Sequence, residues 1–307
     1  MKILIVASGN AGYTSPFVLD QIKSLEKLGI QIDLLKIKGK GVFGYLKNYF
    51  SLISKIKSNN YNLIHAHYGL SGLLASFQWK IPVIITFHGS DINKASNYPL
   101  SFIASRFSDE NIFVHPAQPR KLKIKNNYII PCGVDLSTFY PIDKFTARNK
   151  LGWDQKKKYI IFSSHFNNPV KNVDLAHQAI KKSEQEIEFI ELKGYSKEQV
   201  CTLMNGADLL LVTSKSETGP IVVKEAMACN CPIISTDVGD VSVVINKATL
   251  CFVLPHDPIE IAAKINIILK KPKRSNGRNY IYKYDLYKVA VKVESVYKRF
   301  NKYTIGR

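Results

Sequence analysis

The chain has 307 residues, of which 46% are hydrophobic, and a formal net charge of +19. Its length predicts one large domain or two ordinary ones, with full cores. Its apolar runs are too short to span a bilayer, and its five cysteines lack the spacing of a zinc module, which favours a reducing cytosol over a disulfide framework. Such a basic chain favours an anionic partner. Since it carries no common nucleic-acid-binding motif, we expect an anionic membrane surface and no nucleic acid.

Segments rich in Ile, Val and Leu alternate with helical segments along the whole chain. This alternation predicts an α/β fold of parallel sheets with crossover helices. The first segment, from Met1 to Val6, has the composition of a buried strand rather than of a signal peptide. In the first half we expect helices at 16–28 and 42–56, and strands at 2–7, 31–36, 63–67, 83–87, 112–114 and 128–130.

The segment 131–141 is interpreted as the linker to a second sheet. Beyond it, Ser196 and Gln199 have the spacing of a capping box at the start of a helix. In this half we expect helices at 171–182, 196–204 and 285–300, and strands at 159–163, 187–192, 209–212, 233–235 and 251–254.

The most informative segment is Ser214-Lys-Ser-Glu217-Thr-Gly-Pro-Ile-Val-Val-Lys-Glu225-Ala-Met-Ala228. Glu217 follows a predicted strand, and Glu225 lies one to two turns into the helix that comes next. The backbone N–H groups at 219–222 would open that helix, and a helix N-terminus is a ready anion site. Carboxylates on both sides of an anion site suit a ligand with hydroxyls and phosphates, such as a nucleotide sugar.

The Glu-x7-Glu spacing, the Gly-Pro between the two acids and the Ala-Met-Ala after them resemble the donor-site motif of family 4 glycosyltransferases. The continuation from Cys229 to Asp240 fits the same motif, most closely in the branch that builds teichuronic acid, capsule and related polysaccharides. The resemblance covers nearly the whole chain. It implies the GT-B fold, two Rossmann-like domains facing a central cleft, with an acceptor domain at 1–141, a nucleotide-sugar donor domain at 142–284, and a C-terminal helix at 285–307 that packs back across the domain junction.

The resemblance also implies a retaining, hexosyltransferase-type enzyme that uses a nucleotide-diphospho-sugar. Glu225 would bind the donor ribose, and Glu217 the hydroxyls of the transferred sugar. Backbone groups would cradle the donor at Gly219, Pro220, Ile221 and Val222, although Thr218 departs from the family's usual Glu-Gly. The leaving phosphate would help to deprotonate the acceptor, because no separate nucleophile is visible.

Lys171 resembles the family lysine that neutralises the diphosphate. A fixed ammonium there stabilises the leaving group more in the transition state than in the ground state. Many relatives pair this lysine with an arginine, for which the nearest counterpart here is His165. Either His165 is protonated near the phosphate, or another cation substitutes for the arginine, or the site is weaker.

In the first half, His88 in Thr86-Phe-His-Gly-Ser-Asp91 resembles the family His that faces the reacting sugar. On the acceptor side we place Asp91, for which helix capping is the alternative, and His67. Gly12 belongs to a loop that either approaches the donor or is simply a tight turn. The pair His65 and His67 has a spacing that binds metals, but no third ligand is evident.

No Asp-x-Asp pair occurs in the sequence, so we expect no metal and no cofactor besides the co-substrate. The acceptor implied by the resemblance is a lipid-linked saccharide or other oligosaccharide. The helix expected at 42–56 is amphipathic and flanked by lysines, and it packs on its own sheet or also docks on an anionic membrane through Phe43, Tyr45 and Phe50. We therefore expect a cytoplasmic protein that is peripheral on the inner face of the cell membrane.

Two other function classes remain open. A UDP-sugar epimerase of GT-B fold would share the donor site but would need no acceptor and no membrane. A non-catalytic protein that binds nucleotide sugars or polysaccharides would fit the missing arginine.

Overall fold

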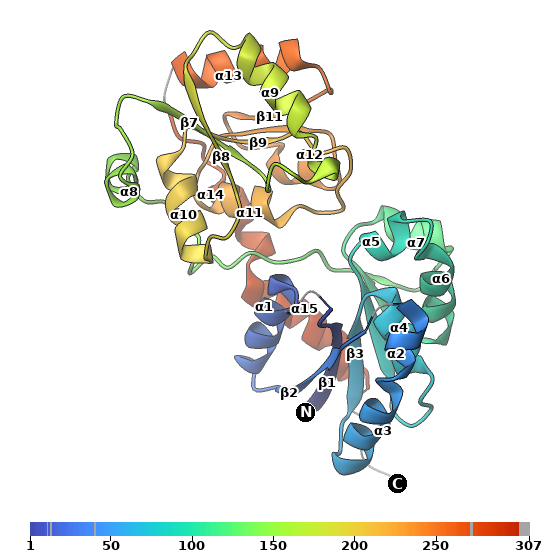
Figure 1. Ribbon diagram of the computed structural model, residues 1–307. Coiled ribbons are helices and arrows are strands. Elements are labelled where there is room, and N and C mark those ends of the chain that lie inside the picture. Colours follow the sequence, from blue (N-terminus) through green and yellow to red (C-terminus); the bar gives the residue numbers. More distant parts are fainter. Residues whose placement is uncertain (11, 13, 40, 271–272, 301–307) are drawn as a thin grey trace. The chain divides into compact units, whose positions relative to one another are not determined.

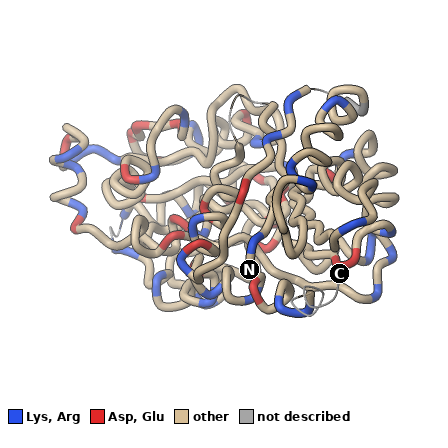
Figure 2. The backbone as a smooth tube through the Cα atoms, turned by 90° about the horizontal axis from the view of Figure 1, so that it is seen from below, with Lys and Arg blue, Asp and Glu red and all other residues tan. Residues whose placement is uncertain are grey.

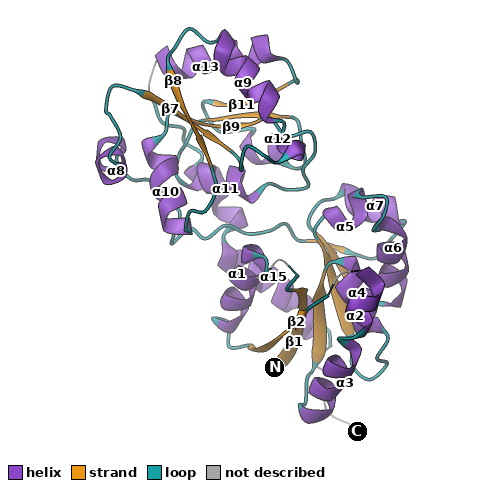
Figure 3. Cartoon of the chain, in the orientation of Figure 1, coloured by secondary structure: helices purple, strands orange, loops and turns teal. Residues whose placement is uncertain are grey.

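The computed structural model describes residues 1–10, 12, 14–39, 41–270 and 273–300 (Figure 1). It divides into two compact units, one of Met1–Cys132 with the segment from Leu286 onward, and one of Gly133–Asp285. Each unit is a parallel β-sheet with helices on both faces (Figure 3). The predicted α/β class with two Rossmann-like domains is confirmed.

The first sheet has six parallel strands in the order β2-β1-β3-β4-β5-β6. Its central strands are buried on both faces, which explains their continuous apolar runs. From β1 the chain continues to β2 on one side of it and then to β3 on its other side. The carboxyl ends of β1 and β3 therefore form a topological switch point. The strands are β1 (Lys2–Ser8), β2 (Gln31–Ile37), β3 (Leu63–His67), β4 (Val83–Phe87), β5 (Glu110–Phe113) and β6 (Tyr128–Ile129).

Two separate apolar layers cover this sheet. On one face, the strands pack against α1 (Pro16–Glu26) and α15 (Leu286–Lys298). The other face is covered by α2 (Gly41–Leu46), α3 (Tyr49–Ser58), α4 (Gly69–Ser76), α5 (Ser90–Asn93), α6 (Tyr98–Phe107) and α7 (Ala117–Leu122).

The prediction of a single helix at 42–56 is wrong, because this segment forms two helices, α2 and α3. The Asn48 side chain lies at the break and donates to the carbonyl oxygens of Gly44 at 2.7 Å and Lys38 at 2.8 Å. An asparagine amide that takes such carbonyls competes with the backbone bonds of a continuing helix. The side chains of residues 41 and 42 lie outside the described part of the chain.

The second sheet has five parallel strands in the order β11-β10-β9-β7-β8, and its switch point lies between β7 and β9. The strands are β7 (Lys158–Phe162), β8 (Ile187–Glu191), β9 (Leu209–Val212), β10 (Ile233–Thr236) and β11 (Cys251–Leu254). One face packs against α9 (Val173–Lys182) and α13 (Pro258–Lys270). The other packs against α10 (Lys197–Gly206), α11 (Ile221–Ala228), α12 (Val241–Ile245) and α14 (Arg278–Ile281). The expected capping box forms at the start of α10.

The segment 133–141, which the sequence analysis placed in the first domain, belongs to the second unit. Leu136 and Phe139 are buried in the core of that unit. The Arg278 guanidinium also donates to their carbonyl oxygens, at 3.1 Å and 2.6 Å. The last helix, α15, belongs to the first unit, where its Tyr297 is fully buried.

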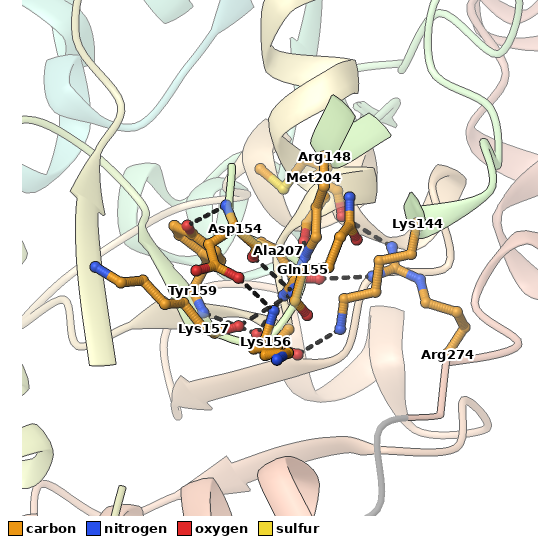
Figure 4. Close-up of polar contacts among 12 residues, drawn as sticks. Lys144, Arg148, Asp154, Gln155, Lys156, Lys157, Tyr159, Met204, Ala207 and Arg274 are labelled. Carbon is orange, nitrogen blue, oxygen red and sulfur yellow. Dashed lines mark hydrogen bonds and ion pairs between the residues drawn. The ribbon is translucent and has the colours of Figure 1, made fainter. Parts of the chain in front are cut away.

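A buried polar network closes the amino-terminal edge of the second sheet (Figure 4). Asp208, just before β9, pairs with Lys144 and with Arg148 at 2.9 Å. Arg148, on α8 (Lys144–Leu151), also donates to the carbonyl oxygens of Gly206 and Gln155, at 2.9 Å and 2.7 Å. Ligands of such sheets bind at the opposite, carboxyl edge, so this network is structural.

Candidate functional site

Lys171 and Glu217 meet at the switch point of the second sheet. Lys171 follows β7, Glu217 follows β9, and the Lys171 Nζ lies 2.5 Å from the Glu217 Oε1. The Ser214 hydroxyl donates to the same oxygen at 2.8 Å. Both charged side chains are largely buried, with 18% and 16% of their surface exposed. The structure thus joins two residues that the sequence analysis took from separate motifs.

Lys171 does not begin a helix, which corrects the helix expected at 171–182. It ends a short 3₁₀ turn, Pro169–Lys171, and α9 begins only at Val173. Between them Asn172 adopts a left-handed conformation with φ of 54°, which breaks the helical path. The Thr213 hydroxyl at the end of β9 lies 2.9 Å from the carbonyl oxygens of Lys171 and of Asn172, so the turn is tied to the neighbouring strand.

The predicted anion site lies beside this pair. Helix α11 begins at Ile221 with Pro220 as its N-cap, and its first free N–H groups face the carboxyl edge. Glu225 is half-buried in the second turn of the helix. A Cβ at position 219 would lie 3.3 Å from both Asp240 carboxylate oxygens, so any larger residue than glycine would require the Asp240 side chain to shift.

A buried ion pair, which the sequence did not predict, lies under this loop. Lys224 is the fourth residue of α11 and is only 1% exposed. Its Nζ lies 3.0 Å from the Asp240 Oδ2 and 5.0 Å from the centre of the Tyr284 ring. The lysine neutralises a carboxylate that would otherwise repel an anion at the helix N-terminus. The signal was present, because Lys224 interrupts an otherwise apolar helix face.

Two histidines stand at the same edge. His165 lies in the loop between β7 and the 3₁₀ turn, partly exposed, and its carbonyl accepts the Asn168 N–H at 3.3 Å. His256, which follows β11 and was not among the predicted residues, donates from Nε2 to the Ser214 carbonyl oxygen at 3.1 Å. Ser214 therefore connects His256 with Glu217.

In the first unit, His67 and His88 form a pair at the ends of β3 and β4. The His67 Nδ1 lies 2.9 Å from the His88 Nε2, and the rings stack at 5.2 Å. The other His88 nitrogen, Nδ1, lies 3.8 Å from the Cys132 Sγ, so both its ring nitrogens have protein neighbours. Burial lowers the pKa of His67 to about 3 and that of His88 well below its usual value, so both are neutral at pH 7.

His65 is satisfied within the core rather than poised for a metal. Its Nδ1 lies 2.5 Å from the Tyr297 Oη and its Nε2 2.7 Å from the Thr86 Oγ1. Among the described residues, no group of three or more His, Cys, Asp or Glu is arranged to hold a metal ion. The His67 Nε2 is buried and has no hydrogen-bond partner in that part of the chain.

Asp91 ties two loops together. Its carboxylate accepts the backbone N–H groups of Gly89 at 2.7 Å, His88 at 3.3 Å and Gly69 at 3.3 Å. Burial nevertheless raises its pKa to about 6. These bonds favour the capping alternative for Asp91. Gly12 has φ of 81° and donates to the Gly9 carbonyl at 3.1 Å, as in a tight turn, while its neighbours 11 and 13 lie outside the described residues.

A pocket of about 300 Å³ opens at the switch point of the first sheet. Asp91 and Leu70 line it. So do the polar side chains of Ser8, Ser15, Tyr45, Tyr68, Ser90 and Asn97. The predicted site residues thus fall into two groups, with Gly12, His67, His88 and Asp91 in the first unit and the others in the second.

Each unit matches a family model. Residues 17–115 match the model described as glycosyl transferase 4-like, and residues 185–284 match the model described as glycosyl transferases group 1.

Curated relatives are similar over most of the chain. The D-inositol 3-phosphate glycosyltransferase of Mycobacterium sp. (strain KMS) is 26% identical in an alignment of 267 positions that covers 69% of this chain and 60% of that protein. TuaC of Bacillus subtilis (strain 168), a candidate teichuronic acid biosynthesis glycosyltransferase, is 26% identical in an alignment of 234 positions that covers 66% of this chain and 60% of TuaC. The match thus spans about three-fifths of the length of these relatives.

Solved structures share the fold. The sucrose-phosphate synthase of Thermosynechococcus elongatus has a TM-score of 0.87 and 17% identity, over 99% of this chain and 100% of that one. HepE of Anabaena, solved in complex with UDP and glucose, has a TM-score of 0.76 and 17% identity, over 97% of this chain and 100% of that one. These likenesses confirm the GT-B fold class.

Proposed function

We propose that this chain, which belongs to the family 4-like, group 1 glycosyltransferases of GT-B fold, moves a hexose from a nucleotide-diphospho-sugar to a saccharide acceptor with retention and without a metal ion. The observation that carries the proposal is the Lys171–Glu217 pair beside the N-terminus of α11. A cation, a helix N-terminus and a carboxylate at one sheet edge match a diphosphate joined to a sugar. That HepE binds UDP supports a uridine nucleotide as the first donor to try.

In this proposal the charged groups divide the donor between them. The first N–H groups of α11 and the Lys171 ammonium hold the diphosphate, whose negative charge grows as the bond to the sugar breaks. Glu217 accepts hydroxyls of the sugar, and Glu225 those of the ribose. The acceptor oxygen attacks the anomeric carbon from the side that the phosphate leaves, and a phosphate oxygen takes the acceptor proton.

The role of His88 in this reaction is positional. Because both its ring nitrogens face protein groups, the imidazole holds the loop after β4 in place more than it offers a free nitrogen to a ligand. His165 and His256 supply the polar groups at the edge where relatives carry an arginine.

We also propose that the acceptor is a lipid-linked saccharide of surface polysaccharide synthesis, which the similarity to TuaC supports, and that the protein works peripherally at the inner membrane face. Lys and Arg positions are spread along both units, so charge alone marks no docking face (Figure 2). The candidates for docking are exposed aromatics of the first unit, since Phe43, Phe50 and Trp79 are 83%, 80% and 79% exposed. None of the described helices is both long and apolar enough to cross a membrane.

A thermal-shift panel of UDP-, GDP-, ADP- and CMP-sugars, each with and without EDTA, tests the donor proposal. A ligand that binds the native state stabilises it by about 2.7 kcal/mol at a concentration 100-fold above its Kd. We expect one nucleotide to raise the melting temperature equally with and without EDTA, and product to form when an acceptor is added. A shift lost in EDTA would contradict metal independence, and binding without any transfer would favour a non-catalytic binding protein.

A further inference from the structure

We propose that the pocket of the first unit binds an uncharged, hydroxyl-rich sugar ring and rejects sugars that carry a carboxylate or a phosphate. The inference rests on the proposed function, in which the first unit receives the acceptor. It adds the chemical class of the acceptor sugar, to which the transferred sugar becomes linked.

The pocket lies where the topology of the first sheet favours a ligand. Ser8 ends β1 and Tyr68 directly follows β3, while Ser15 is the N-cap of α1 and Leu70 lies in the first turn of α4. These two strand ends form the switch point of the sheet, and parallel sheets bind ligands there. Its volume of about 300 Å³ is at the lower end for ligand sites, which fits a single sugar ring.

Tyr68 is held over the pocket in a strained conformation. Its φ of 72° lies in a region that non-glycine residues avoid, and its N–H is fixed to the Thr86 carbonyl at 2.9 Å. Backbone strain of this kind concentrates at functional sites. The Tyr68 ring, which lines the pocket, lies 4.8 Å from the His88 ring and 6.4 Å from the Phe17 ring, so Tyr68 is the aromatic wall between the pocket and the predicted site residue's neighbours. A sugar ring has apolar C–H faces that pack on such a wall, and polar edges for the hydroxyls around it.

The electrostatics of the pocket oppose an anion. The Asp91 carboxylate lines it, is 4% exposed, and receives its bonds from backbone N–H groups. No Lys or Arg stands among the described residues of the lining. An acidic sugar would lose its water beside a like charge without gaining a cation. Serine and tyrosine hydroxyls both donate and accept, as sugar hydroxyls do, so a neutral ring finds partners for its polar edge.

The test compares matched ligands that differ only in charge. Octyl β-D-glucoside, octyl β-D-galactoside and octyl α-D-mannoside, each with its octyl uronide, are titrated below their micelle concentrations onto the full chain at pH 7.5. We expect at least one neutral glycoside to bind about tenfold or more tightly than its uronide, because the uronide brings a second carboxylate close to that of Asp91. Equal or tighter binding of every uronide, or no binding of any neutral glycoside, would overturn the proposal.

A positive charge introduced at the edge of the pocket shows whether the preference for neutral glycosides arises in this pocket or from non-specific binding elsewhere. Ser90 is exposed at the start of α5, so Ser90→Lys adds a cation without disturbing the core, and Ser90→Gln is its neutral control. We expect Ser90→Lys to bind the uronides about tenfold more tightly, and Ser90→Gln to keep the original preference. Unchanged uronide affinity in Ser90→Lys would count against the pocket. Because these titrations contain no donor, their result is distinct from failure of the nucleotide-sugar panel.

Discussion

At the scale of single residues, the ion pair of Lys171 and Glu217 is the central feature of the candidate donor site. A 2.5 Å contact fixes the ammonium at the sheet edge before any donor arrives. Such preorganised charge acts mainly on the transition state, so Lys171→Met should lower kcat about 100- to 1,000-fold and raise the donor KM much less. Steady-state kinetics with the donor found in the thermal-shift panel measure both constants.

The matched control for this variant is Lys215→Met. Lys215 is exposed in the loop after β9, two residues before Glu217, and its one hydrogen bond among the described residues is from its backbone N–H to the Val170 carbonyl at 2.8 Å. It should keep kcat within about threefold, since exposed surface charges contribute little. A Lys171→Met enzyme that turns over as fast as the Lys215→Met enzyme would remove Lys171 from the mechanism.

Some residues of the candidate site were predicted from the sequence and others were not, and the difference lies in whether they belong to a recognisable motif. Lys171, Glu217 and Glu225 stand in motifs whose spacing alone points to a donor site. Lys224 and His256 carry no such spacing, and a lysine in a helix ordinarily lies in water. Only the folded chain shows that Lys224 is 1% exposed and paired with Asp240, because that depends on packing between segments far apart in sequence.

At the scale of helices and strands, the apolar segments of the sequence located every described strand to within about two residues. They could do so because buried parallel strands are continuous apolar runs. Several short helices, among them α4 to α8, were not predicted at all, and two predicted helices were wrong because of single polar side chains. Asn48 divides α2 from α3, and Asn172 delays α9, and neither effect is visible in periodicity. The boundary between the units was misplaced for a related reason, since the packing of Leu136 and Phe139 decides it.

The break between α2 and α3 bears on membrane docking. Phe43 and Phe50 stand exposed on the two helices, whereas Tyr45 is buried and does not contribute. Burying each ring in a lipid interface is worth about 1.5 kcal/mol, so the double variant Phe43→Ser/Phe50→Ser should bind anionic phosphatidylglycerol vesicles about 100-fold less. Co-sedimentation measures this. Phe145→Ser, which removes a 61% exposed ring from the second unit, should bind as the parent does. Equal losses in both variants, or binding that ignores lipid charge, would refute docking through these helices.

For the molecule as a whole, the buried imidazoles make the first unit the acid-sensitive one. Burial lowers the pKa of His65, His67 and His88, all in the first unit. The unfolded chain therefore binds protons below about pH 6.5 that the folded unit excludes, and stability falls as pH falls from there. With a folded pKa of about 3, His67 alone costs the unit about 3 kcal/mol at pH 4.5. Asp91, whose pKa is raised to about 6, gains protons in the folded state and offsets about 2 kcal/mol of the combined loss.

Two tryptophans allow each unit to be followed separately. Trp79 lies in the first unit and Trp153 in the second, so Trp153→Phe and Trp79→Phe leave one fluorescent reporter in each. Between pH 7.5 and 4.5, the urea midpoint reported by Trp79 should fall clearly more than the midpoint reported by Trp153. His67→Gln should flatten the dependence for the first unit, because one excluded proton is gone. Midpoints that fall in parallel in the two units, or a His67→Gln slope identical to the parent's, would show that these imidazoles are not the source of the acid sensitivity.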